Sequence, residues 1–173
     1  LIARALAVTA SPALAARVVV TRSAEVARLA RAAGAETVLH SLPGRNDTVR
    51  LGLDALLDDC PSLGGCIFLP GDQPLLRRES LEAMVRGFRA QKETERVILR
   101  LGWRAGGAEP LLGSPVLFGS SHFDALRALP EGKGGGVVIR QHPGCVRAVY
   151  AQSAEELEDA DTVERLEALK RFL

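Results

Sequence analysis

The stretch "GCIFLPGDQPLL", residues 65–76, decides how the rest of the chain is interpreted. Its apolar run, residues 66–69, predicts a buried strand, which Pro70 and Gly71 end. Asp72 follows directly, and Asp before Gln-Pro is typical turn chemistry, so a structural role is the default interpretation. A carboxylate at the end of a buried strand is also the hard oxygen ligand that Mg²⁺ prefers. The stretch alone leaves both roles open.

Apolar, often β-branched runs alternate with longer stretches of helical periodicity along the whole chain. The predicted strands are residues 17–21, 36–40, 65–69, 96–101, 114–119 and 145–151. The predicted helices are residues 1–11, 23–35, 47–59, 78–91, 120–129, 134–143 and 161–173. This alternation predicts one α/β domain with a mainly parallel sheet covered on both faces. In such sheets ligands gather at the carboxyl ends of the strands, where Asp72 is expected.

Composition and charge exclude several classes of function. The chain has 47% hydrophobic and 25% charged residues, as in an ordinary globular protein. Its net charge is +1, with both signs interspersed, which argues against nucleic acid as a partner but not against a phosphorylated small molecule. No apolar run approaches the roughly 18 residues that a membrane span needs, and no secretory signal pattern occurs. We therefore expect neither a nucleic-acid partner nor a membrane.

The cysteines and histidines carry no recognisable chemistry. The three cysteines form no CxxC pair and are odd in number, which predicts a cytoplasmic protein without a structural metal. The three histidines are scattered, so a zinc site built on histidine is not expected. No G-x-S-x-G, HExxH or Cys/His pattern occurs, which leaves hydrolase and metalloprotease functions without support.

A second carboxylate candidate lies in "EDADTVERLEAL", residues 158–169. Asp161 as a helix N-cap, with Glu164 reaching back, explains the pattern without any function. The strand predicted before it can nevertheless bring Asp159 or Asp161 to the same sheet edge as Asp72. Two carboxylates that meet there would suit a metal-bridged triphosphate.

Two glycine- or cap-rich segments are candidates for binding anions. In "LPEGKGGGVV", residues 129–138, glycines ahead of a helix can present backbone N–H groups to an anion, with Lys133 as a point charge. A mobile surface loop is the equal alternative, and the spacing is not that of a P-loop. In "RNDTVRLGL", residues 45–53, Asp47 is expected to cap a helix, whose N-terminus could also contact a base or phosphate.

Taken together, these segments resemble the MobA-like nucleotidyltransferase family, and within it the molybdenum cofactor cytidylyltransferases. "LIARALAVTASPALAARVVVT" is similar to the family's first helix and second strand, and "DTVRLGLDAL" to its Ser-x-x-x-Gly-Leu helix, with Thr48 in the serine's place. "LPGDQPLL" matches its Gly-Asp-Gln-Pro turn, "GSPVLFG" its Gly-x-Pro-Val-Leu-Phe strand, and "DADTVERLEAL" its closing helix. The resemblance covers essentially the whole chain in order. The Gly-Asp-Gln-Pro turn and the Pro-Val-Leu-Phe strand favour the cytidylyl branch over the guanylyl branch, whose turn usually reads Asp-Met-Pro.

The resemblance implies a fold, a reaction and a set of site residues. The fold would be a three-layer Rossmann-like sheet with helices on both faces, of the nucleotide-diphospho-sugar transferase type. The reaction would be Mg²⁺-dependent transfer of CMP from CTP to the phosphate of molybdopterin, a phosphorylated pterin, with release of pyrophosphate and a molybdoenzyme as the recipient. Asp72 and Asp161 would be the catalytic metal ligands. The nucleotide-binding residues would be Asn46, Asp47, Thr48 and Gly71, and the acceptor-binding residues Gln73, Ser114, Pro115 and Lys133.

The chain departs from the family pattern in two places. The family's first strand and its Gly-rich loop, which holds the triphosphate, should precede Leu1, so we expect residues 1–173 to form a single domain that lacks both. Where the family often has Gly-Asp-x-Gly-x-Arg, residues 132–136 read Gly-Lys-Gly-Gly-Gly. Two alternatives therefore stay open. One is a guanylyltransferase of the same fold that uses GTP and acts on molybdopterin or a phospho-acid, and the other is a non-catalytic relative that binds the pterin cofactor.

Overall fold

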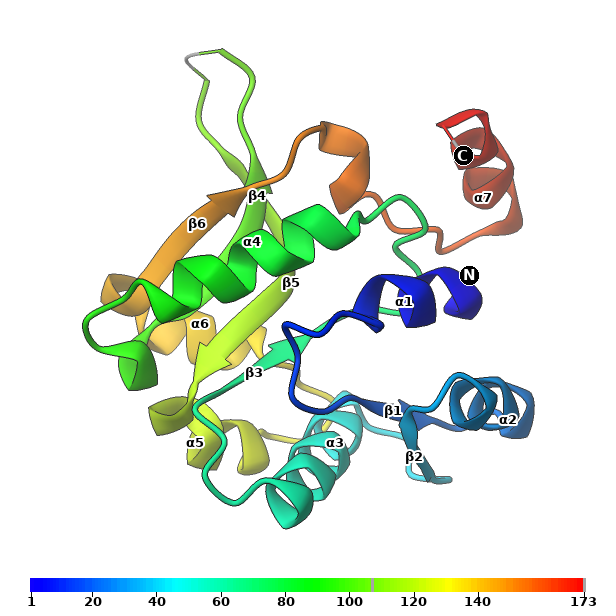
Figure 1. The fold of residues 1–173 in the computed structure, drawn as a ribbon, viewed down its shortest axis with the longest axis horizontal. Helices are drawn as coiled ribbons and strands as arrows, with labels where there is room; N and C mark the ends of the chain where they lie inside the picture. Colours follow the sequence, from blue (N-terminus) through cyan, green and yellow to red (C-terminus); the bar gives the residue numbers. More distant parts are fainter. Residues whose placement is uncertain (107, 173) are drawn as a thin grey trace.

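A computed structural model describes residues 1–106 and 108–172 and has an α/β fold, which confirms the predicted fold class (Figure 1). One sheet has four strands, in the order β3 (Gly65–Phe68), β5 (Leu111–Gly119), β4 (Ile98–Trp103) and β6 (Val146–Tyr150). The other has two parallel strands, β1 (Val18–Thr21) and β2 (Glu36–Leu39).

The four-stranded sheet is mixed, not mainly parallel as the sequence predicted. β5 runs antiparallel to both β3 and β4, whereas β4 and β6 are parallel. Only residues 104–110 connect β4 to β5, and a parallel connection needs a dozen or more residues. The short connection therefore forces a hairpin where the alternation of elements favoured a parallel strand. Gly107, in the loop predicted here, lies outside the described residues.

Each predicted helix is present, with ends that differ by a few residues. The helices are α1 (Ile2–Thr9), α2 (Ala24–Ala32), α3 (Arg45–Asp59), α4 (Arg78–Arg89), α5 (Phe123–Arg127), α6 (Gly136–Gln141) and α7 (Val163–Leu169). Short 3₁₀ turns occur at Thr94–Arg96, Ser120–His122, Pro143–Cys145, Ala154–Leu157 and Lys170–Phe172. Leu173, the last residue of the predicted closing helix, lies outside the described residues. None of the helices in the described ranges has the length and apolar character needed to cross a bilayer.

Local side-chain chemistry explains where α2 and α3 begin. The Ser23 hydroxyl accepts the Val26 N–H at 3.3 Å, so it caps α2 as predicted. α3 begins two residues before the predicted start, with Gly44 as its N-cap. Asp47 lies inside the first turn and accepts the Gly44 N–H at 3.2 Å. The prediction that Asp47 is the N-cap residue is therefore wrong. Asp47 is the third residue of the helix, and its carboxylate reaches back to accept the N–H of the N-cap residue.

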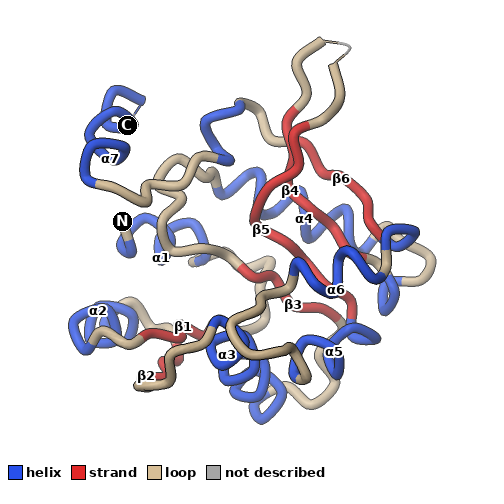
Figure 2. Tube along the Cα trace, turned by 180° about the vertical axis from the view of Figure 1, so that it is seen from behind, coloured by secondary structure: helices blue, strands red, loops and turns tan. Residues whose placement is uncertain are grey.

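Helices cover both faces of the four-stranded sheet, as Figures 1 and 2 show from opposite sides. Neighbouring strand residues point to opposite faces, so Ile98 and Leu99 enter different cores. The core shared with α4 contains Met84, Leu99, Leu101 and Leu117. The core shared with α3, α5 and α6 contains Leu53, Ile98, Phe118, Leu126 and Val138. This layering matches the predicted three-layer arrangement.

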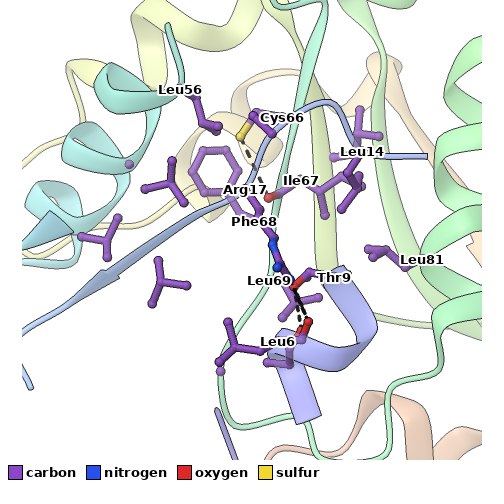
Figure 3. Close-up of a pocket in the computed structure, with 18 of the residues that line it drawn as sticks. Leu6, Thr9, Leu14, Arg17, Leu56, Cys66, Ile67, Phe68, Leu69 and Leu81 are labelled. Atoms are coloured by element: carbon purple, nitrogen blue, oxygen red, sulfur yellow. Dashed lines mark hydrogen bonds between the residues drawn. The ribbon is translucent and has the colours of Figure 1, made fainter. Parts of the chain in front are cut away.

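An apolar groove of about 960 Å³ separates the two sheets (Figure 3). Every residue of β1 and of β3 lines it, together with side chains from α1, α3 and α4 such as Leu6, Leu56 and Leu81. Within the described chain, β1 pairs only with β2 and β3 pairs only with β5. Each of these two strands therefore has one edge without a strand partner, and the sheet is interrupted between them.

Candidate functional site

Asp72 lies in the turn that follows the carboxyl end of β3, as the sequence predicts. The residue is half-buried, and its Oδ1 atom is buried without a hydrogen-bond partner among the described residues. A buried oxygen left unpaired costs free energy, so such a group indicates a partner that the protein itself does not provide. The unpaired oxygen therefore marks this turn as a candidate ligand site.

Gln73 ties the same turn to the neighbouring strand. Its side chain is almost fully buried, with 4% of the residue exposed, and its Nε2 donates to the Ser114 carbonyl oxygen at 3.2 Å. The Ser114–Pro115 peptide bond is cis, and Pro115 is buried. The Gln73 Oε1 atom is also buried without a partner among the described residues. The structure thus brings three of the predicted acceptor-site residues together next to Asp72.

Asp159 comes to this turn from the other end of the chain. The backbone N–H of Ala160 donates to the backbone oxygen of Asp72 at 2.8 Å, which holds residues 159–160 against the turn. Partial burial of the Asp159 carboxylate raises its pKa, and the negative charge of Asp72 raises it further, while a hydrogen bond from Gln73 acts in the opposite direction. Two carboxylates therefore meet at the end of β3, as the sequence left possible.

Asp161 lies two residues further along, at the exposed start of α7. The side chain that caps α7 is Thr162, whose Oγ1 accepts the Arg165 N–H at 3.1 Å, so the interpretation of Asp161 as the N-cap is wrong. A hydroxyl one residue closer to the helix provides the cap. Within the described chain Asp161 makes no hydrogen bond or ion pair, although its charge contributes to the raised pKa of Asp159. Its assignment as a metal ligand stays a prediction.

The two predicted anion-binding segments contact each other. Asn46, in the first turn of α3, accepts the Gly132 N–H through its Oδ1 atom at 2.9 Å. Gly132 has a φ angle of +70°, which favours glycine at this position. Lys133 is exposed and forms no ion pair within the described ranges. Sequence reasoning predicted both segments but not their contact.

Arg45 is a residue that the sequence reasoning missed. It is exposed at the start of α3, unpaired among the described residues, and its Cδ atom lies 4.0 Å from where a side chain would begin at Gly134. A cation is normally unfavourable at a helix N-terminus. An arginine at the start of a predicted helix was therefore a signal in the sequence that could have drawn attention to Arg45. Arg45 and Lys133 together place two unpaired cations beside the glycine loop.

The remaining predicted nucleotide-binding residues are Asp47 and Thr48, which follow Asn46 on α3, and Gly71, which precedes Asp72. Asp47 is engaged structurally, since it pairs with Arg50 at 3.4 Å in addition to its contact with Gly44. Thr48 is exposed and lines the apolar groove, as does Gly71 next to Asp72. In the described part of the chain, no hydrogen bond or ion pair joins the Asp72 turn to the segment around Asn46. Their roles toward a nucleotide stay predictions.

Comparison with known proteins decides the family. The family model of the MobA-like NTP transferase domain matches residues 1–148. The chain belongs to this family of nucleotidyltransferases. The predicted family is therefore confirmed, while the cytidylyl branch within it stays a prediction.

Individual relatives add detail about fold and reaction class. The chain is 37% identical over 90 residues to the 3-phospho-D-glycerate guanylyltransferase of Phenylobacterium zucineum, a match that covers 51% of this chain and 39% of that protein. Among solved structures, Rv0371c from Mycobacterium tuberculosis superposes with a TM-score of 0.76 at 19% identity, covering 98% of this chain and 83% of the other. A 4-diphosphocytidyl-2C-methyl-D-erythritol synthase gives 0.71 at 15% identity, covering 98% and 86%. These two likenesses confirm the fold.

Proposed function

We propose that this chain transfers a nucleoside monophosphate from a nucleoside triphosphate to the phosphate of a small acceptor. An acceptor phosphate oxygen forms a bond to the α-phosphorus while the bond from that phosphorus to the bridging oxygen breaks, so pyrophosphate leaves. The observation that carries the proposal is the pair of carboxylates, Asp72 and Asp159, at the carboxyl end of β3 in a member of this family. In such transfers catalysis consists largely of positioning and charge neutralisation.

The residues of the Asp72 turn fit a divalent cation. A buried, unpaired carboxylate oxygen, a second carboxylate and an unpaired amide oxygen are all hard oxygen donors, which Mg²⁺ prefers. When bound there, Mg²⁺ would neutralise charge on the triphosphate. The protein's own contribution is to keep Asp72 in a fixed position, because Gln73 anchors the turn to β5. A manganese complex of the Mycobacterium tuberculosis neighbour Rv0371c supports a divalent cation in this fold.

The specific substrates that we propose are CTP and molybdopterin, with a molybdoenzyme as the eventual recipient. The support is the ordered set of motifs, above all Gly-Asp-Gln-Pro at residues 71–74 and Pro-Val-Leu-Phe at residues 115–118. The contact between Gln73 and Ser114 joins these two motifs in space, next to Asp72. An acceptor phosphate bound along this strand would lie beside the carboxylates.

A second candidate pair is GTP and a small phosphorylated acid. The curated relative from Phenylobacterium zucineum is a 3-phospho-D-glycerate guanylyltransferase. Its sequence identity to this chain, 37%, is higher than the 19% and 15% of the two solved structures described above. Arg45 and Lys133 also provide two unpaired cations, which would suit an acceptor that carries a phosphate and a carboxylate. The loop at residues 132–136, which lacks the family's Asp and Arg, fits an acceptor other than the pterin.

The domain organisation implied by the resemblance, a single domain in residues 1–173 that lacks the family's first strand and Gly-rich loop, stays part of this proposal. Its support is the groove between β1 and β3, which is apolar, lies between two unpaired strand edges and is covered by helices. These are the surroundings that a further buried strand requires.

The experiment that tests the proposed function measures pyrophosphate release. The protein is incubated with Mg²⁺, with CTP or GTP, and with molybdopterin or 3-phosphoglycerate, and thermal unfolding in each nucleotide reports which base binds. Release with CTP and molybdopterin supports the first pair, and release with GTP and 3-phosphoglycerate supports the second. Absence of release with every combination overturns the catalytic proposal in favour of a non-catalytic cofactor-binding protein.

A further inference from the structure

Arg100 is a half-buried arginine on β4 that the site described above does not use. Its Nη2 donates to the Leu112 carbonyl oxygen at 2.9 Å, and its Nε donates to the Gly113 carbonyl oxygen at 3.4 Å. We propose that the Arg100 guanidinium binds a carboxylate of the acceptor and so selects a small phosphorylated carboxylic acid over an acceptor that has only a phosphate. This inference rests on the proposed function, because it names the acceptor class of that transfer.

The pairing of β4 with β5 is irregular next to Arg100. Arg100 lies opposite Val116, whereas Gly102 lies opposite Leu112. Residues 113–115 of β5 therefore lie opposite a single residue of β4. Bulged stretches of this kind re-aim side chains and are common beside active sites. The guanidinium donates to this stretch, which includes two of the predicted acceptor-binding residues.

Two side chains hold the bulged stretch from the two neighbouring strands. Gln73, which follows β3, donates to the Ser114 carbonyl oxygen at 3.2 Å. Arg100 on β4 donates to the carbonyl oxygen of the preceding residue, Gly113. Because Gln73 is next to Asp72 in the turn, only this short piece of β5 separates the guanidinium from the turn. An acceptor whose phosphate lies at the turn therefore extends toward Arg100.

The sheet is open on the face where the Arg100 side chain begins. Side chains alternate along a strand, so Arg100 shares its face with Ile98, which packs in the core of α3, α5 and α6. Figure 2 looks onto this face, and no helix lies in front of the carboxyl-terminal end of β4 there. The Nη1 atom of Arg100 makes no hydrogen bond within the described chain and is not among its buried unpaired atoms. It is therefore open to a ligand.

The charge of Arg100 has no acidic partner in the protein. No ion pair within the described ranges involves this residue, and its hydrogen bonds go to neutral carbonyl oxygens. Partial burial lowers the pKa of the guanidinium, and no neighbouring carboxylate offsets that shift. A cation that is partly removed from water without an anion costs free energy. A ligand carboxylate would offset this cost, and its two oxygens match the planar fork of an arginine.

Arg45 and Lys133, two further unpaired cations, are less suited to this role. Both are exposed beside the glycine loop, and in the described part of the chain no hydrogen bond or ion pair joins their segments to the Asp72 turn. Arg100, in contrast, is half-buried and is connected to that turn through two adjacent residues of β5. The geometry therefore places the acceptor carboxylate at Arg100.

The test measures binding of 3-phosphoglycerate and of glycerol 3-phosphate, which lacks the carboxylate, by isothermal titration calorimetry with Mg²⁺ and without nucleotide. We expect the unmodified protein to bind 3-phosphoglycerate with a Kd lower by about tenfold or more, as a hydrogen-bonded charge pair provides. In Arg100→Gln the two Kd values should agree within about twofold, because glutamine cannot pair with the carboxylate. Thermal unfolding checks that the variant is folded.

Arg147→Gln is the matched control, since it removes the same charge from the neighbouring strand. Arg147 is exposed on β6 and lies opposite Leu99, so its side chain begins on the other face of the sheet. This variant should keep the full preference for 3-phosphoglycerate. Arg100→Lys keeps the charge but loses the fork, so we expect an intermediate preference. The lysine variant also decides the matter where Arg100→Gln does not fold.

Three results would overturn the inference: no binding of 3-phosphoglycerate, equal Kd values for the two ligands in the unmodified protein, or a full preference that persists in the Arg100 variants. The outcome is separable from the proposed function. A preference that depends on Arg100 in a protein that releases no pyrophosphate would refute the proposed function only. Pyrophosphate release with molybdopterin at a rate that Arg100→Gln leaves unchanged would refute this inference only.

Discussion

The four-stranded sheet and the two-stranded sheet of this molecule differ in how their strands are surrounded. β4 and β5 lie inside the larger sheet, pair on both edges and carry fully buried side chains such as Ile98, Leu99 and Phe118. All four residues of β1, in contrast, are only half-buried, and β1 pairs on one edge. The chain thus contains one sheet with a core on each face and one that faces an apolar groove.

This difference shows where the stability and the candidate site lie. Asp72 and Gln73 follow β3, and Gln73 is anchored to β5, so the Asp72 turn is held by the well-packed sheet. Thr48, which is predicted to contact the nucleotide from α3, borders the groove instead. We therefore expect the metal-binding half of the site to be stiffer than the nucleotide-binding half.

The largest expected effect comes from truncating a side chain in the larger sheet. Phe118 is 1% exposed and packs edge-on against Phe68, with 5.8 Å between ring centroids. Phe118→Ala should lower the free energy of unfolding by about 3–5 kcal/mol, because it removes a buried aromatic ring and leaves a cavity. Val19→Ala, in half-buried β1, should cost only about 1 kcal/mol. Urea unfolding measures both, and equal losses would contradict the proposed difference between the sheets.

The second prediction concerns Cys66, which lies on β3 between the groove and the core. Burial raises the pKa of its thiol from 9.0 to about 12. At pH 8 its thiolate fraction should therefore be about a thousandfold lower than that of an ordinary cysteine, and a thiol reagent should label Cys60 and Cys145 first. Because the neutral form is the one favoured in the fold, this contribution to stability is present below pH 9 and is lost as the pH rises toward 12. Rapid labelling of Cys66 in the folded protein would show instead that solvent in the groove reaches β3.

The third prediction compares backbone protection in the two sheets. Amides of β1 and β2 should exchange with solvent faster than those of β4 and β5 by about two orders of magnitude, because local opening of the half-buried pair exposes little apolar surface. Hydrogen exchange followed by mass spectrometry measures this. Equal protection would mean that the two sheets unfold as one cooperative unit.

The smallest expected effect sharpens the same comparison. Ser23→Ala removes the side-chain cap of α2, which packs on β1 and β2, at a cost of about 1 kcal/mol or less. We expect faster exchange in β1 and β2 with little change in β4 and β5. A uniform increase across both sheets would argue against separate stabilities.

Sequence reasoning predicted the elements of this fold better than their pairing. Apolar periodicity and turn residues locate strands and helices, since these signals are local in the chain. The direction of β5 depends on the length of the connection at residues 104–110, and the position of the α3 cap depends on which way the Asp47 carboxylate turns. Neither is visible in periodicity alone.

The site was predicted in part for the same reason. The turn around Asp72 and the need for a second carboxylate follow from local patterns. The choice between Asp159 and Asp161 depends on the hydrogen bond from the Ala160 N–H to the Asp72 backbone oxygen. The hydrogen bond between Asn46 and Gly132 joins residues that are 86 positions apart in the sequence. Contacts between distant segments of this kind leave no trace in a single sequence.

The catalytic role of Asp72 is tested by pyrophosphate release from the unmodified protein and from Asp72→Asn, with Mg²⁺ and the nucleotide and acceptor that support turnover. Asp58→Asn, which removes an exposed carboxylate at the far end of α3, is the matched control. We expect Asp72→Asn to lose activity by about a hundredfold or more, while the control stays near the unmodified rate and both variants stay folded. Full turnover by Asp72→Asn would contradict the claim that the turn after β3 holds the catalytic cation.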